Sequence, residues 1–212
     1  MYSSFQQTPA DPSVKKRLSM HHISKEVKAS NEYYSLEENE RGHLNIRVKA
    51  ENQNFINGLL EVTGLKLPTS SLGIQKNDQY TLYWISPDEF LLLVPVGTEF
   101  KIENQIRAVI NESDPSCHFA ILNVSSAQTI LTLSGSRAES ILKKSTPYNI
   151  HPSNLPLGKV VTTVFAKTQV VLSRTKGVGM GSSDNSEEFT IIVRRSFSDY
   201  VWRWIVDAGK RE

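Results

Sequence analysis

Residues 80–94 carry the sequence YTLYWISPDEFLLLV, which contains the clearest structural signal in the chain. Tyr80, Leu82 and Trp84 alternate with other side chains, as expected for a strand with one buried face. The Pro and Asp of Ser86–Glu89 are typical of a tight turn. The apolar run from Phe90 to Val94 predicts a well-buried return strand. Together these features predict a β-hairpin.

Helices and further strands are expected on both sides of this hairpin. Before it, alternating apolar residues predict a strand over 43–50, and helical spacing predicts a helix that ends at Gly64, a residue suited to a left-handed C-cap. After it, an apolar stripe from Ile102 to Ile110 predicts a second helix, with Thr98 as its N-cap.

The same pattern of strands and helices continues to the C-terminus. Strands are expected over 119–124 and 129–133, then a helix opened by a Ser136–Glu139 capping box, strands over 160–166, 170–174 and 189–194, and a helix from Ser196 to about Gly209. This order predicts an α+β fold of two ferredoxin-like halves with antiparallel sheets and packed helices.

Two segments lack such patterns. Residues 1–42 are polar and aperiodic, which predicts a flexible N-terminal arm followed by one domain over 43–212. The Gly/Ser-rich stretch from Lys176 to Glu188 predicts a hairpin loop; a phosphate-binding loop is the alternative, but no helix pattern or Gly-Lys-Ser/Thr follows it.

Composition excludes several classes of protein. The chain has 212 residues, with 24 Lys plus Arg against 22 Asp plus Glu, so a formal charge of +2 offers no strong field for nucleic acid or anionic lipid. The longest apolar run is far shorter than the ~20 residues that span a bilayer, and no secretory signal follows the basic residues near the N-terminus. We expect a cytoplasmic protein.

The sequence shows no catalytic, cofactor-binding or metal-binding set. Its five histidines lack zinc-binding spacing, and the single cysteine, Cys117, cannot build a thiolate site alone. Leu133–Ser136 lacks the glycine frame of a serine nucleophile elbow.

The C-terminal helix offers a candidate interface. Plotted on a helical wheel, Phe197, Tyr200, Val201, Trp204, Ile205 and Ala208 gather on one face, which we expect to be the core face. Trp202 and Val206 fall on nearly the opposite side. We expect these two residues, with Arg194 and Arg195 just upstream, to meet another protein, because an exposed Trp leaves a large apolar area in water. For Trp202 the alternative is partial cover by loops of its own chain, and for the arginines a solvated strand end.

Two stretches resemble the gamma subunit of heterotetrameric sarcosine oxidase. One is Trp84–Leu92, with Trp84, Pro87, Asp88 and Glu89. The other is Val193–Trp204, and its matching residues are Arg194, Arg195, Ser196, Phe197, Asp199, Tyr200, Trp202 and Trp204. Shorter matches lie between them in the expected order. The chain departs from the family pattern at Ser86 and Phe90.

The resemblance implies a fold like the folate-binding domain of aminomethyltransferases and a non-catalytic role. In that family the alpha and beta subunits carry FAD, FMN, NAD and the tetrahydrofolate site, the delta subunit carries zinc, and gamma packs against them. The assembly demethylates sarcosine to glycine and passes the one-carbon unit to tetrahydrofolate.

The sequence leaves two alternatives open. The chain could belong to a related N-methylglutamate dehydrogenase complex. It could also be a folate-binding, aminomethyltransferase-like enzyme, which would need a carboxylate facing the pterin; Asp88 and Glu89 are the candidates.

Overall fold

A computed structural model describes residues 28–177 and 186–210. Its elements, in chain order, are β1 (Lys28–Ser30), β2 (Ser35–Asn39), β3 (Gly42–Arg47), α2 (Gln53–Thr63), β4 (Ile74–Lys76), β5 (Thr81–Ser86), β6 (Glu89–Val94), α3 (Glu99–Ser113), β7 (Ala120–Asn123), β8 (Gln128–Gly135), α4 (Ala138–Lys143), β9 (Val160–Phe165), β10 (Thr168–Lys176), β11 (Glu187–Arg194), the 3₁₀ turn η1 (Arg195–Phe197) and α5 (Ser198–Lys210).

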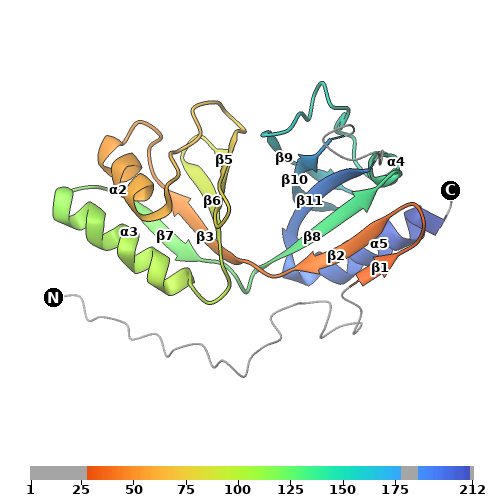
Figure 1. Ribbon diagram of the computed structural model, residues 1–212, viewed down its shortest axis with the longest axis horizontal. Coiled ribbons are helices and arrows are strands. Elements are labelled where there is room, and N and C mark those ends of the chain that lie inside the picture. Colours follow the sequence, from red (N-terminus) through yellow and green to blue (C-terminus); the bar gives the residue numbers. More distant parts are fainter. Residues whose placement is uncertain (1–27, 178–185, 211–212) are drawn as a thin grey trace.

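The strands form two antiparallel sheets that face each other, with helices on the two outer sides (Figure 1). The six-stranded sheet has the order β1-β2-β8-β11-β10-β9, and α4 and α5 cover its outer face. The five-stranded sheet has the order β4-β5-β6-β3-β7, and α2 and α3 cover its outer face. The predicted α+β class with two sheet-and-helix halves is confirmed.

The hairpin expected at residues 80–94 forms as β5 and β6. Its return strand is apolar from Phe90 to Val94 because both of its faces are buried there. Phe90 and Leu92 pack against α2 and α3, whereas Leu91 and Leu93 point to the other sheet. The space between the sheets is a third apolar cluster, which includes Tyr83 of β5, Ile130 of β8 and Ile192 of β11.

The expected boundary of the N-terminal arm is wrong. Residues 28–39 form β1 and β2, and β2 pairs along its whole length with β8. Tyr34 and Leu36 lie in the core under α5. The backbone turns closely at Gly135, whose φ of 129° suits glycine, and a side chain there would meet the Tyr33 carbonyl. The rest of the expected arm, 1–27, lies outside the described residues, as does most of the Gly/Ser-rich stretch (178–185).

Helix ends were only partly predicted. Gly64 ends α2 in the left-handed conformation with a φ of 71°, as expected. Of the three predicted N-caps, Thr98 does hold the N-cap position of α3 but makes no side-chain cap bond, and the other two are displaced. The Thr98 hydroxyl donates backward to the Pro95 carbonyl, α4 begins after Arg137 instead of Ser136, and a 3₁₀ turn places the start of α5 at Ser198 instead of Ser196. The Thr98 hydroxyl has a competing backbone partner, which spacing alone does not reveal.

Two short segments connect the sheets where the chain passes from β2 to β3 and from β7 to β8 (Figure 1). His43 lies at this junction and is 2% exposed. Its backbone N–H donates to Ser125 Oγ at 2.9 Å, and its Nδ1 lies 3.2 Å from Gln128 Oε1. Burial lowers the pKa of His43 to about 4, against a smaller opposing effect of the hydrogen bond to Gln128.

We expect His43 to make the fold sensitive to acid. An unfolded histidine takes up a proton below about pH 6.5, whereas His43 resists protonation until about pH 4, so stability should fall as pH drops between these values. Relative to a His43→Gln variant, wild type should lose about 3 kcal/mol of unfolding free energy between about pH 7.5 and pH 4. Urea titrations at each pH measure this.

Exposed His118 provides the matched control. His118→Gln should leave the pH dependence of unfolding close to that of wild type. Parallel pH curves for wild type and His43→Gln would contradict the assignment of the acid effect to His43.

Candidate functional site

The Trp84–Glu89 motif is a folded hairpin end. Trp84 packs on Phe90 with ring centroids 5.4 Å apart. The Asp88 carboxylate accepts from Arg47 at 3.2 Å, and Glu89 accepts from Asn45 at 2.7 Å and from Arg47 at 2.9 Å. Both acids are therefore engaged in joining the hairpin to β3. A groove opens between the two sheets, and neither acid is among the residues that line it. Asp88 and Glu89 therefore do not form a pterin site there.

The C-terminal helix presents the opposite indole from the one expected. Trp202 is 1% exposed and lies in the core of the six-stranded sheet, whereas Trp204 is 38% exposed. Val206 is half-buried against the same core. The expectation that Trp202 and Val206 face a partner while Trp204 is enclosed is wrong.

Small residues explain why α5 buries Trp202 and exposes Trp204. The buried face of α5 runs through Ser198, Val201, Trp202, Ile205 and Gly209, together with Ala208. Ser198 and Gly209 add nothing to an apolar stripe, yet they mark the side on which the helix backbone comes closest to the sheet. A side chain at Gly209 would collide with the Tyr34 ring. The true core face is thus rotated toward Trp202.

The remaining motif residues lie at the start of α5 and on its outer side, except Tyr200, which also packs against the core. Phe197 is 40% exposed, and Tyr200 packs on Trp204 with ring centroids 5.9 Å apart. Trp204 Nε1 donates to Ser145 Oγ at 2.5 Å, and Asp199 pairs with Arg203 one turn along. Arg194 and Ser196 are exposed, and Arg195 is half-buried. The exposed rings of Phe197 and Trp204 and the end of β11 thus lie at one surface.

A buried charge cluster holds the other end of the six-stranded sheet. Arg174 of β10 has a side chain 1% exposed. Its guanidinium binds Glu187 of β11, Glu139 of α4 at 3.0 Å, the carbonyl of Ile150 at 2.7 Å and the carbonyl of Leu155 at 3.2 Å, and it lies 4.5 Å from the centroid of the Phe189 ring. One side chain therefore ties together two strands, a helix and the loop before β9.

The two carboxylates of this cluster differ in their proton affinity. Burial raises the pKa of Glu187, outweighing the attraction of Arg174. Burial acts the same way on Glu139, but hydrogen bonds from Lys143 and Arg174 outweigh it and hold the pKa of that carboxyl below its usual range. The charged form of Glu139 is thus favoured, and Glu187 is the group more easily protonated.

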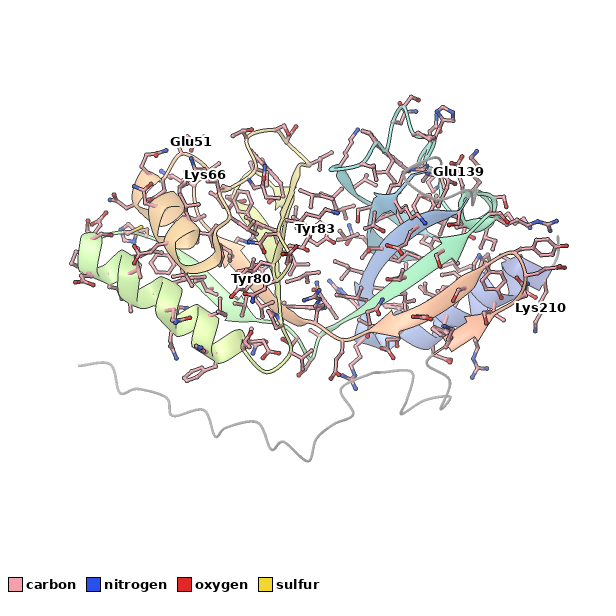
Figure 2. All side chains as sticks on the ribbon, viewed as in Figure 1. Glu51, Lys66, Tyr80, Tyr83, Glu139 and Lys210 are labelled. Carbon is pink, nitrogen blue, oxygen red and sulfur yellow. The ribbon has the colours of Figure 1, made fainter. Side chains whose placement is uncertain are left out.

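A groove of about 780 Å³ opens between the two sheets. Residues of β4, β5 and β6 form one wall, and residues of β8, β10 and β11 form the other. Tyr83 points from β5 into the space between the sheets (Figure 2). The sequence did not predict this groove, because its walls come from strands distant in the chain and only their pairing brings them together.

The described residues contain neither a cluster of metal ligands nor a membrane-spanning helix. The described part of the chain holds no group of three or more His, Cys, Asp or Glu side chains placed to bind a metal ion. Within those same residues, no helix is long and apolar enough to cross a bilayer.

A family model described as "Sarcosine oxidase, gamma subunit family" matches residues 47–211. The match contains both sequence motifs and most of the chain. The chain belongs to the sarcosine oxidase gamma subunit family. The resemblance of the two motifs to this family is thereby confirmed.

Curated members of the sarcosine oxidase gamma subunit family are similar over much of the chain. The subunit gamma from Corynebacterium sp. (strain P-1) is 29% identical over 71% of this chain and 67% of its own length. The one from Corynebacterium sp. (strain U-96) is 26% identical over 71% and 66%, and the one from an Arthrobacter species is 26% identical over 59% and 54%. The aligned region thus spans between about half and two thirds of these relatives.

Solved structures agree with the gamma-family fold. A chain of the heterotetrameric sarcosine oxidase from Corynebacterium sp. U-96, in complex with pyrrole 2-carboxylate, has a TM-score of 0.75 and 22% identity, covering 92% of this chain and 95% of that one. The glycine cleavage system aminomethyltransferase T from Bartonella henselae has a TM-score of 0.56 and 10% identity, covering 83% of this chain and 46% of that one. The implied aminomethyltransferase-like fold is confirmed.

The buried charge cluster of this gamma-family chain is not predicted from its sequence, although the sequence contains a signal for it. Arg174 follows the buried residues Val170 and Leu172 of a strand. A charged residue there requires a charged partner. The partners, Glu139 and Glu187, lie on other elements, so only the fold identifies them.

Proposed function

We propose that this chain is a non-catalytic, structural subunit of a heterotetrameric, sarcosine-oxidase-type flavoenzyme complex in the cytoplasm. The family match over residues 47–211 carries the proposal. Such a complex demethylates sarcosine to glycine and transfers the one-carbon unit to tetrahydrofolate. The alpha, beta and delta subunits would be the partners of this chain and would hold FAD, FMN, NAD, zinc and the folate.

The contact with those partners would include the surface around the start of α5. Arg194 and Arg195 offer planar donors suited to carboxylates. Beside them, Phe197 and Trp204 expose aromatic area, the kind of side chain that dominates binding energy at interfaces. Trp204 takes the interface role first expected of Trp202.

Co-expression with the other subunits tests the subunit role. The chain should co-purify in a fixed ratio with a sarcosine-oxidising, flavin-containing assembly, and omitting it should remove assembly and activity. The isolated chain should show no flavin absorbance. A chain that runs alone while the remaining subunits assemble and oxidise sarcosine normally would refute the proposal.

Paired substitutions test the surface. Phe197→Ala combined with Trp204→Ala should weaken binding to the partner subunits by about 2 kcal/mol or more. Retention on a tagged partner subunit measures this loss. Phe100→Ala is the matched control, because Phe100 is a similarly exposed aromatic on α3, 45% exposed, in the other half of the molecule. Equal retention of both variants would place the contact elsewhere.

A further inference from the structure

The groove between the sheets combines an apolar base with hydroxyl groups on its walls. Leu93 of β6 and Ile130 of β8 belong to the apolar cluster between the sheets, and Tyr83 adds an aromatic ring. Half-buried threonines line the walls, namely Thr81, Thr132, Thr175 and Thr190. Pockets for small organic ligands have this character and a volume of roughly 300–1,000 Å³. At about 780 Å³ the groove could hold such a molecule.

Two cations stand at one end of the groove. Lys76 pairs in register with Thr81 across β4 and β5, and Arg41 donates Nη1 to the Gln79 carbonyl in the turn between those strands at 3.2 Å. The Arg41 guanidinium and the backbone of Lys76 therefore lie close to the same turn. Both side chains are exposed at the rim.

These charges are available to a ligand. No carboxylate within residues 28–177 and 186–210 forms an ion pair with Arg41 or Lys76. Glu40 is the one acid among the described lining residues. Arg174 also lines the groove, but its guanidinium is already engaged by two carboxylates and two carbonyls.

We propose that the groove binds a small organic anion with a flat apolar body, the body lying against Tyr83, Leu93 and Ile130 and the anionic group lying between Arg41 and Lys76. The apolar base provides burial for the body. Charge-assisted hydrogen bonds from a planar guanidinium and a mobile ammonium fix the anionic end. The proposed binding of an anion in this groove does not rest on the chain being a subunit of a sarcosine-oxidase-type complex.

A fluorescent aromatic sulfonate tests the site on the full chain. We expect 8-anilinonaphthalene-1-sulfonate to bind at one saturable site, and Arg41→Gln with Lys76→Gln to raise its Kd about tenfold or more. The neutral analogue N-phenyl-1-naphthylamine should bind wild type and the double variant equally, because it lacks the anionic group.

Lys66→Gln is the matched control, since Lys66 is an exposed lysine in the loop after α2, outside the groove (Figure 2). It should leave the Kd of the sulfonate unchanged. Unsaturable binding, no binding, an unchanged Kd in the double variant or an equal loss of the neutral analogue would each overturn the proposal. Circular dichroism checks that all variants keep the fold; the two groove substitutions are at exposed side chains.

Discussion

Trp202→Ala should destabilise the isolated chain by about 3–5 kcal/mol, the usual range for removing a large aromatic side chain from a core. The indole is 1% exposed and packs in the cluster formed by the six-stranded sheet, α4 and α5. Its removal leaves a cavity beneath the helix that the surrounding strands cannot fill. Urea unfolding followed by circular dichroism measures the loss.

Trp204→Ala is the matched comparison, two residues along the same helix. Its indole is 38% exposed and bound to Ser145, so its loss removes one hydrogen bond and part of a surface contact. We expect a loss of about 1 kcal/mol. Equal losses at both positions, or a larger loss at Trp204, would contradict the burial described for α5.

Arg174→Met should destabilise the chain by about 3–5 kcal/mol, because it leaves carboxylates buried without their cation. The loss should also depend on pH. Without Arg174, the pKa of Glu187 in the folded state should rise further above its unfolded value, so the variant should regain stability relative to wild type as pH falls from about 8 to about 5. Urea titrations across this range measure the change.

Two further variants separate charge from shape at this cluster. Glu187→Gln added to Arg174→Met should restore part of the stability and flatten its pH dependence. Arg203→Met is the exposed control, since Arg203 pairs with Asp199 on α5 with a side chain 71% exposed, and it should change stability by less than about 1 kcal/mol. A pH-independent loss in Arg174→Met would contradict the role of the buried carboxylates.

Most of the fold could be predicted from the sequence, because apolar periodicity reports directly on burial. The alternation before Trp84 and the continuous run from Phe90 to Val94 identified both strands of the hairpin, although Tyr83 buries the second face of β5 as well. β1 and β2 could not be found this way. They are short and polar, and they are strands because β8, far along the chain, offers β2 a free edge.

The proposed functional surfaces were harder to predict from the sequence. Hydrophobicity placed the C-terminal helix almost correctly, but Ser198 and Gly209 define its core side by being small. The proposed anion site depends on Arg41 and Lys76, which are ordinary surface residues in the sequence and line the same groove only in the folded chain. The local sequence pattern predicts helices and strands, whereas these surfaces form only when helices and strands distant in the sequence pack together.

The two connections between the sheets make one half of the molecule an insertion within the other. All five strands of the β3-containing sheet come from a continuous stretch, residues 42–123, while the other sheet takes β2 from before it and β8 from after it. β2 and β8 are direct neighbours, so their pairing must close a long loop, which is entropically costly for an unfolded chain. Prior folding of the inserted half brings those two ends together. We therefore expect the chain to fold from its middle outward.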